Sequence, residues 1–286
     1  SELRGVPADN IFLGVGSDEC IDLCYRVFCR PGKDNVVAID PTYGMYKVCA
    51  DINDVEYRAV DLNPDYSINV DRLLAATDDN TKAIWICSPN NPTGNAFPLD
   101  TIEEIARRFD GITVVDEAYV DFSPLGSMVA RLAAYPRMIV MQTFSKAWAA
   151  AAMRLGIAFA SRDIISLFNN VKYPYNINIL TQREAIHLLE NAPKVKATAE
   201  KLVELRKALA AELLRLNAVK AVYPSDANFL LVKVDDANSL YDYLKAEGVI
   251  VRNRSRVNLC EGALRITVGN PDENLLLLEK IKQYGG

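Results

Sequence analysis

The sequence predicts an α/β protein with a large domain built on a mainly parallel sheet, followed by a smaller C-terminal α+β domain. Short apolar runs alternate with helical segments along the first two-thirds of the chain. From about Asn191 the pattern changes to a long charged helix, followed by strands and further helices. Half of the 286 residues are hydrophobic, which is enough to bury a sizeable core. We therefore expect residues 1–190 to form the large domain and residues 191–286 the small one.

Individual elements follow from the same periodicities. The strands predicted for the large domain lie at 36–39, 83–87, 113–115, 138–144 and 157–160. Segment 100–109 has apolar residues at helical intervals, and Thr101 and Glu104 have the spacing of a capping box, which predicts a helix that covers the sheet. In the C-terminal part we expect a helix at 194–216, strands near 228–234 and 264–268, and helices from Asn238 and Asp272.

Composition excludes several classes of function. The net charge of -5 is mild, and no dense Lys/Arg stretch with interleaved aromatics indicates a nucleic-acid surface, so we expect small-molecule partners. No apolar run reaches the length of a membrane span, and the six cysteines read as reduced core thiols. The cytoplasm is the expected location, unless a leader has been removed. The single histidine, His187, lies in a helical segment and favours a structural role, so we expect no metal site.

One lysine at the end of a predicted buried strand is a candidate nucleophile. Lys146 follows Thr143 and Ser145, and Arg154 comes eight residues later. Segment 147–153 is small and mostly apolar, so the lysine can be desolvated and its pKa lowered, which makes a neutral amine available near pH 7. We interpret Lys146 as the amine that forms a Schiff base with pyridoxal phosphate (PLP), between hydroxyls and a cation suited to the phosphate.

An aspartate ends another predicted strand. Asp116 follows the apolar run 113–115, and a carboxylate there is costly unless a cation offsets it. The protonated ring nitrogen of PLP is such a cation, and holding that proton keeps the ring an electron sink. The alternative is that Asp116 caps the segment that follows it.

Three loops carry further candidates. The turn 88–94 follows a strand and can present Asn91, whose amide can donate to the phenolic oxygen of the ring, although such a turn is also common loop chemistry. A glycine turn precedes an apolar helix, so the backbone N–H groups around Ser17 and Asp18 can receive a phosphate. Tyr43 can stack on a flat ring or be an ordinary half-buried tyrosine.

The order and combination of these motifs resemble the fold type I PLP-dependent aminotransferases and, within them, the histidinol-phosphate aminotransferases. The motifs that carry the resemblance are Gly16-Ser-Asp-Glu, Pro41-Thr-Tyr-Gly, Asn91-Pro-Thr-Gly, Asp116-Glu-Ala-Tyr, Ser145-Lys146, Arg154-Leu-Gly and Leu264-Arg-Ile-Thr-Val-Gly. The histidinol-phosphate branch rests chiefly on segments 173–178 and 116–122 and on Arg252 and Arg265.

The resemblance implies roles for these residues. Lys146 would carry a proton between substrate and cofactor, and Asp116 would pair with the ring nitrogen. Asn91 and Tyr119 would donate to the phenolic oxygen, and Tyr43 would stack on the ring. The cofactor phosphate would be held by Arg154, Thr143, Ser145 and the backbone of Ser17 and Asp18.

The substrate's anionic end would be held by Arg265 and Arg252, because a planar guanidinium suits both phosphate and carboxylate. A surface ion pair is the alternative for either arginine. The implied reaction converts L-histidinol phosphate and 2-oxoglutarate to imidazole acetol phosphate and L-glutamate, in histidine biosynthesis. A homodimer is also implied, since sites in this family draw residues from both subunits.

Other readings stay open at this point. An aromatic or other amino acid aminotransferase of the same fold is the nearest, and a PLP-dependent lyase similar to threonine-phosphate decarboxylase is the second. The third is an effector-binding module, which in some transcription regulators is joined to a helix-turn-helix domain that we do not find in this sequence.

Two departures from the family pattern bear on activity. The sequence starts at the segment that in relatives immediately precedes the Gly-Ser-Asp turn, so we expect that the N-terminal arm usual in the family is missing. In addition, 149–152 is a run of four alanines where relatives usually carry glycine, so we expect a less permissive turn near Arg154.

Overall fold

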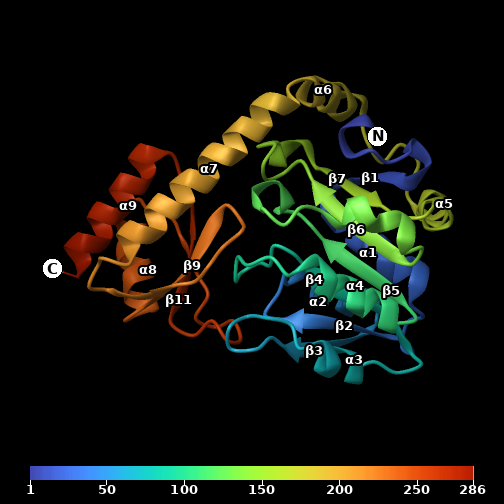
Figure 1. The fold of residues 1–286 in the computed structure, drawn as a ribbon, viewed down its shortest axis with the longest axis horizontal. Helices are drawn as coiled ribbons and strands as arrows, with labels where there is room; N and C mark the ends of the chain where they lie inside the picture. Colours follow the sequence, from blue (N-terminus) through green and yellow to red (C-terminus); the bar gives the residue numbers. More distant parts are fainter. Residues whose placement is uncertain (286) are drawn as a thin grey trace.

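The computed structural model describes residues 1–285, which form two sheets joined by a long helix (Figure 1). The large sheet has the strand order β1-β7-β6-β5-β4-β2-β3. Its strands are β1 (Ile11–Val15), β2 (Asn35–Asp40), β3 (Glu56–Asp61), β4 (Thr81–Cys87), β5 (Ile112–Asp116), β6 (Met138–Thr143) and β7 (Leu155–Phe159). The pairs from β3 to β6 are parallel, and β7 runs antiparallel to both β6 and β1. The predicted α/β class with a mainly parallel sheet is confirmed.

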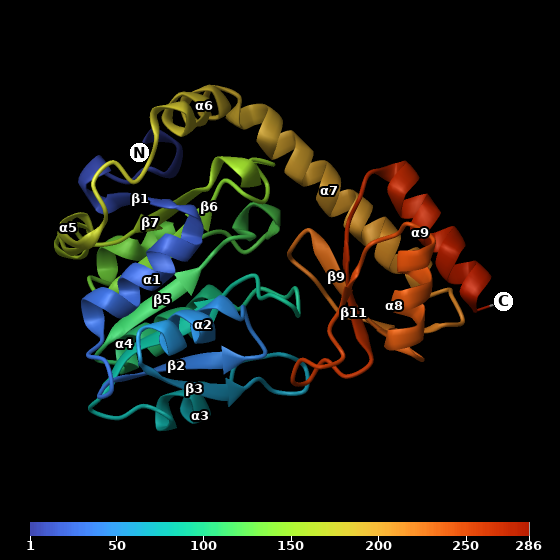
Figure 2. The same cartoon turned by 180° about the vertical axis from the view of Figure 1, so that it is seen from behind.

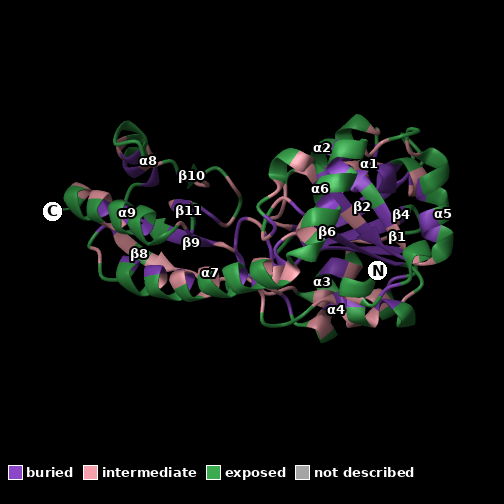
Figure 3. Ribbon diagram, turned by 90° about the horizontal axis from the view of Figure 1, so that it is seen from above, coloured by how far each residue is buried: buried purple, intermediate pink, exposed green. Residues whose placement is uncertain are grey.

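Helices cover both faces of this sheet. They are α1 (Gly16–Phe28), α2 (Met45–Ile52), α3 (Val70–Ala75), α4 (Leu99–Arg108) and α5 (Arg162–Val171). In β2, Val36 and Ala38 pack in the core under α1, α2 and α5, whereas Val37 and Ile39 pack in the core under α3 and α4. This alternation follows from the two-residue period of a strand. Figure 3 shows the resulting layers, with buried strands between helices whose outer sides are exposed.

The second sheet is antiparallel and has the order β10-β11-β9-β8. Its strands are β8 (Val219–Val222), β9 (Phe229–Val234), β10 (Arg252–Asn253) and β11 (Ala263–Thr267), with α8 (Ala237–Ala246) and α9 (Pro271–Tyr284). α7 (Ala192–Leu213) contributes Leu209 and Leu213 to the core between this sheet and its helices. Figure 2 shows the small sheet beside α8 and α9, at the end of α7 that lies away from α6 (Ile179–Glu190).

We propose a domain boundary at 190/191, between α6 and α7. From there α7 passes the large domain and continues along the small sheet (Figure 1). A small buried cluster joins the two parts: Tyr119 and Phe122 come from the large domain, Ala199 from α7, and Phe229 from β9. The remaining short helices are 3-10 turns: η1 (Glu2–Arg4), η2 (Ala8–Asn10), η3 (Val120–Phe122), η4 (Met128–Ala134) and η5 (Ala151–Met153).

The prediction and the structure differ in three respects. The capping box at Thr101 and Glu104 is wrong, because α4 begins at Leu99, after Pro98, and Thr101 already lies inside its first turn. The long helix ends at Leu213, not at Leu216, because a turn leads directly into β8. The outer strands β1 and β3 were not predicted.

Candidate active site

The carboxyl ends of the central parallel strands lie side by side at one edge of the large sheet. Cys87 at the end of β4 is in register with Asp116 at the end of β5, and Asp116 is in register with Met141 in β6. The loops after β4 and β6 carry Asn91 and Lys146. Ligands of open α/β sheets bind at this edge, so the fold brings these side chains to a suitable place.

The residues predicted to bind the cofactor all line one hollow at this edge. They are Ser17, Asp18, Tyr43, Asn91, Asp116, Tyr119, Thr143, Ser145, Lys146 and Arg154. These residues come from α1, from the last positions of β5 and β6, and from the segments after β2, β4, β5, β6 and η5. Their gathering in space is a finding of the structure, and their individual roles remain predictions.

Lys146 lies in the turn after β6. Its Nζ is 5.3 Å from the centroid of the Tyr119 ring. The residue keeps access to solvent, yet desolvation lowers its pKa, and the nearby Arg265 lowers it further, while Asp116 acts in the opposite direction. A lowered pKa increases the fraction of neutral amine, which is the nucleophilic form.

Asp116 is buried, with 2% of its surface exposed. Its Oδ2 accepts a hydrogen bond from the Tyr46 hydroxyl at 2.7 Å, and its Oδ1 accepts one from the backbone N–H of Ala118 at 3.0 Å. Burial raises the pKa of Asp116, whereas these two hydrogen bonds and Lys146 oppose the rise. A carboxylate held in this way is suited to bind a cationic N–H group.

An anion site lies next to the carboxylate. α1 begins at Gly16, whose N–H donates to the Arg154 carbonyl at 2.8 Å, and has no side-chain cap among residues 1–285, so the N–H groups of Ser17 and Asp18 are available to a ligand. The Thr143 and Ser145 hydroxyl oxygens are 3.0 Å apart, and both line the same hollow. Arg154 adds a guanidinium, whose Nη2 is 3.3 Å from Asp18 Oδ2. Helix N–H groups, hydroxyls and a cation together fit a phosphate.

Two glycines leave the space that this anion site needs. Gly16 has φ of +72°, and a Cβ there would lie 2.4 Å from Arg154 Nη2. A Cβ on Gly156 would lie 2.3 Å from the Ser17 backbone nitrogen. Larger residues at either position would therefore displace the groups that make up the site.

The alanine run near Arg154 adopts strained backbone. Ala149 has φ of +53° and Arg154 has φ of +52°, which is the left-handed region that glycine occupies most easily. Such conformations cost on the order of 1–2 kcal/mol for residues with a Cβ. The turn therefore has the geometry that glycine would favour, and Ala149 adopts it at a cost in conformational free energy.

Arg265 reaches from the small sheet to the edge of the hollow. Its Nη1 donates to Asn91 Oδ1 at 2.7 Å, which leaves the Asn91 amide N–H groups for another acceptor. The guanidinium lies over the Phe229 ring at 4.9 Å, and its buried Nε has no hydrogen-bond partner among residues 1–285. Burial lowers the pKa of Arg265. A buried cation with an unused donor is suited to bind an anion.

The structure places Arg252 differently. It is exposed on β10, opposite Arg265 in register, whereas Arg265 is half-buried, and neither arginine is among the residues that line the hollow. Arg254, which was not predicted, is partly buried and has a buried Nε without a partner among the described residues. Burial is the main cause that lowers the pKa of Arg254. The charge of Arg254 in turn lowers the pKa of the nearby Tyr119. The signal was present in the sequence, because residues two apart on a strand share a face.

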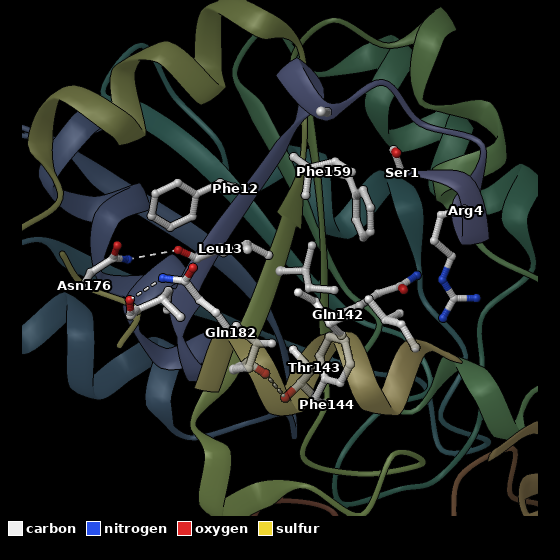
Figure 4. A pocket seen from close by; sticks show the side chains of 18 of the residues that line it. Ser1, Arg4, Phe12, Leu13, Gln142, Thr143, Phe144, Phe159, Asn176 and Gln182 are labelled. Carbon is white, nitrogen blue, oxygen red and sulfur yellow. Dashed lines mark hydrogen bonds between the residues drawn. The ribbon is translucent and has the colours of Figure 1, made fainter. Parts of the chain in front are cut away.

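A larger hollow lies elsewhere on the molecule (Figure 4). It has a volume of about 890 Å³ and lies along β1, β6, β7 and α6. Phe12, Leu13 and Phe159 line it, and Arg4 and Lys172 are the charged side chains among its described lining residues. Because it brings no carboxylate and amine together, we assign the chemistry to the smaller hollow around Lys146.

The described part of the chain shows neither a candidate metal site nor a candidate membrane-spanning helix. Within residues 1–285, His, Cys, Asp and Glu side chains form no group of three that could hold a metal ion. No helix in that range is long and apolar enough to cross a membrane.

The site as a whole matches the chemistry of a flat heteroaromatic ring that carries a phosphate. Asp116 would accept from a protonated ring nitrogen, the α1 terminus and Arg154 would hold the phosphate, and Tyr43 provides an aromatic face at the hollow. The Lys146 amine would react with a carbonyl group. The donors, acceptors and charges present are those that pyridoxal phosphate requires.

Comparisons with known proteins identify relatives of this chain. Residues 2–281 match the family described as aminotransferase class I and II. The chain is 52% identical over 286 residues to a histidinol-phosphate aminotransferase of Bacteroides thetaiotaomicron, which covers 100% of this chain and 83% of the relative. A solved histidinol-phosphate aminotransferase from Clostridium acetobutylicum superposes with a TM-score of 0.89 at 23% identity, over 96% of this chain and 84% of the other.

A further solved structure shares the fold. The histidinol-phosphate aminotransferase from Sinorhizobium meliloti in complex with pyridoxal-5'-phosphate has a TM-score of 0.88 at 21% identity, over 99% of this chain and 78% of the other.

Proposed function

We propose that this chain, which belongs to the class I and II aminotransferase family, transfers the amino group of L-histidinol phosphate to 2-oxoglutarate with pyridoxal phosphate as cofactor. The observation that carries the proposal is the convergence of Lys146, Asp116 and Arg154 on one hollow. The choice of substrate is supported by the 52% identity to a relative of that name.

The cofactor would be held at three points. Asp116 would accept the proton of the ring nitrogen, the α1 terminus and Arg154 would hold the phosphate, and Asn91 and Tyr119 would donate to the phenolic oxygen. Bound there, the protonated ring withdraws electrons from the substrate carbon that loses its proton. Burial raises the pKa of Tyr119 to about 12, so its hydroxyl keeps the proton that it donates.

Lys146 would serve first as the attachment point of the cofactor and then as the proton carrier. Its lowered pKa increases the neutral fraction of the amine, and the neutral Nζ would take the proton that the substrate Cα loses. The same group would then return that proton on the cofactor side. The Tyr119 ring, 5.3 Å from Nζ, limits where the side chain lies.

Arg265 and Arg254 would hold the anionic end of the substrate. Both guanidinium groups have a buried Nε without a partner in the described chain. A phosphate in one half-reaction and a carboxylate in the other present similar oxygens to them, so one pair of cations serves both substrates. Arg252, exposed beside them, would add to the positive field.

We also propose that the enzyme is a homodimer and works in the cytoplasm. Exposed apolar side chains line the large hollow, namely Leu3, Leu13, Tyr175, Ile186 and Leu189. Exposed apolar surface of this kind is typical of subunit interfaces. The six cysteines are buried free thiols, as suits a reducing compartment, and cell fractionation tests the location.

The test begins with cofactor attachment. PLP is added to the purified protein, the mixture is reduced with borohydride, and peptide mass spectrometry should locate the cofactor on Lys146. The Lys146→Ala variant should fold normally by circular dichroism and hold no covalent cofactor. Attachment at another lysine, or normal turnover by the variant, would overturn the assignment.

The substrate is tested in the same preparation. L-histidinol phosphate and L-glutamate are added separately, and each should change the visible absorbance of the bound cofactor and release its own keto product. Release of carbon dioxide in place of a keto product would indicate a lyase. A response to glutamate and aromatic amino acids, without one to histidinol phosphate, would indicate a different aminotransferase.

A further inference from the structure

We infer that Tyr46 is a positioning residue that holds Asp116 ionised and correctly oriented for the cofactor; this inference rests on the proposed function. The Tyr46 hydroxyl donates to Asp116 Oδ2 at 2.7 Å, and the residue is fully buried. Tyr46 does not line the hollow, so it would act on the cofactor through Asp116.

A stack of three aromatic rings fixes the position of this hydroxyl. Tyr46 stacks on Trp85 of β4 with centroids 4.8 Å apart, and Tyr25 of α1 stacks on Trp85 at 5.4 Å. The Tyr25 hydroxyl donates to the Tyr46 backbone carbonyl at 2.7 Å. The Tyr46 ring is therefore held by its neighbours from α1 and β4, and its hydroxyl has little freedom to move.

Each oxygen of the Asp116 carboxylate accepts a hydrogen bond from a different donor. Oδ2 receives the Tyr46 hydroxyl, and Oδ1 receives the Ala118 N–H at 3.0 Å. Each carboxylate oxygen has two lone pairs, so each can accept one more hydrogen bond. Neutral donors fix the positions of both oxygens. The remaining lone pairs therefore have fixed directions, as an acceptor for a ring N–H requires.

The same hydroxyl favours the charged form of Asp116. Burial disfavours that form, and hydrogen bonds to the carboxylate favour it. Other titratable groups near it are Lys146 after β6, Asp18 and Cys20 on α1, Cys87 on β4, Tyr43 after β2 and Tyr119 after β5. Among these, Lys146 also favours the carboxylate, whereas Asp18 disfavours it. Tyr46 supplies its contribution as a neutral donor, without a charge that would compete with the ring nitrogen.

The Tyr46→Phe variant separates the role of the hydroxyl from the packing of the ring. A phenyl ring at position 46 keeps the stack on Trp85 and removes only the hydroxyl. We expect Tyr46→Phe to weaken PLP affinity about ten-fold, because a hydrogen bond to a charged group is lost. Tyr25→Phe is the matched control, since it also removes one buried hydroxyl from the same stack but leaves the bonds of Asp116 intact. Equal losses of affinity in the two variants would overturn the inference.

A double variant tests whether Tyr46 acts through Asp116. Asp116→Asn removes the carboxylate, so adding Tyr46→Phe should then change PLP affinity by less than about two-fold. A further ten-fold loss in the double variant would show that Tyr46 acts by another route.

A measurement on the protein without cofactor separates this inference from the proposed function. Aspartate labelled with carbon-13 at the carboxyl group reports the titration of Asp116 by NMR, with Asp116→Asn used to assign the signal. Tyr46→Phe should move that titration to higher pH, and Tyr25→Phe should not. An unchanged titration would overturn the inference even if transamination is confirmed, whereas failure of PLP to attach to Lys146 would overturn the proposed function alone.

Discussion

Arg265 lies on β11 and Arg254 follows β10, and both have a buried Nε without a partner among residues 1–285. We predict that Arg265→Ala raises the apparent KM for both L-histidinol phosphate and 2-oxoglutarate, by about 10- to 100-fold, because a charged hydrogen bond is lost. Arg254→Ala should affect the phosphate substrate more, since a dianion gains more from a second cation. Steady-state kinetics with each substrate varied in turn provides the measurement.

Arg252→Ala is the matched control for these arginines. It removes a guanidinium that is exposed, whereas Arg254 and Arg265 are partly buried, so apparent KM should change by less than about three-fold. If Arg252→Ala has the largest effect of the three variants, the structural assignment is wrong. If Arg265→Ala changes only cofactor affinity, its proposed contact with the substrate is wrong.

Glu117 provides a prediction on stability. It is fully buried one residue after Asp116, and its carboxylate accepts from the Ser127 hydroxyl, the Gln142 amide and the Met128 N–H. Burial raises the pKa of Glu117 from 4.5 to about 7, although these hydrogen bonds oppose the rise. A carboxyl group with a raised pKa favours folding while protonated. Its contribution is therefore complete below about pH 4.5 and is lost as the pH rises through about 7.

Glu117→Gln should remove this dependence, because an amide does not titrate in that range. Relative to the variant, the wild type should lose up to about 3 kcal/mol of unfolding free energy between about pH 5 and about pH 8. Urea unfolding at the two pH values measures the difference, and groups common to both proteins cancel. Parallel pH profiles would show that Glu117 stays ionised in the folded protein.

Residue types at strand ends could be predicted, and exact partners could not. Lys146 and Asp116 could be predicted because a charged group at the end of a buried apolar strand carries a desolvation cost, which indicates that another group offsets it. Tyr46 has no such signal, since a tyrosine in an apolar helix reads as core, and its bond to Asp116 depends on how α2 packs against β4 and β5. Arg254 was missed because burial beside a short edge strand depends on how that strand pairs with β11.

At the scale of elements, α9 carries the clearest helix cap. The Asn270 side chain accepts from the Glu273 N–H at 3.0 Å, and Glu273 Oε2 accepts from the Asn270 N–H at 2.8 Å. We predict that Asn270→Ala lowers the unfolding free energy by about 1 kcal/mol. Thr101→Ala is the control, because Thr101 lies inside α4 and caps nothing, so its effect should stay within about 0.5 kcal/mol. Urea denaturation measures both, and a larger effect at Thr101 would contradict the observed start of α4.

The same comparison explains which elements were predictable. Strands β2, β4, β5 and β6 are buried on both faces and read as continuous apolar runs. The outer strands lack that signal. β1 is interrupted by Gly14, and β3 mixes charged and apolar residues because it lies at the edge of the sheet. Capping-box spacing at Thr101 failed because Pro98 had already set the start of α4.

At the scale of the whole molecule, the site is assembled from both sheets. Arg265 of the small sheet binds Asn91 of the large domain at 2.7 Å, and the Tyr119 ring packs on Phe229 at 5.1 Å. The sequence indicated two parts with the right secondary structure, yet it held no information on how they face each other. That arrangement depends on long-range contacts such as these. The hydrophobic periodicity of the sequence is a local signal and does not reveal such contacts.

The apolar hollow leads to a prediction about assembly. Ile186 on α6 lines it and is 60% exposed in the single chain. If a second copy covers this surface, light scattering should give the mass of a dimer. Ile186→Glu should then raise the dimer dissociation constant about ten-fold or more, because an unpaired carboxylate would be buried at a cost above about 1.4 kcal/mol.

The matched control for this assembly test is Leu275→Glu. Leu275 is 57% exposed on α9, so the substitution adds the same charge to a helix of the small domain, away from the hollow. A dimer that survives Leu275→Glu but dissociates in Ile186→Glu places the interface at the hollow, since added charge alone is then excluded as the cause. Equal weakening by both variants would point to a general effect of charge. A wild-type monomer would overturn the proposed dimer, and cofactor attachment to Lys146 could still be tested in that monomer.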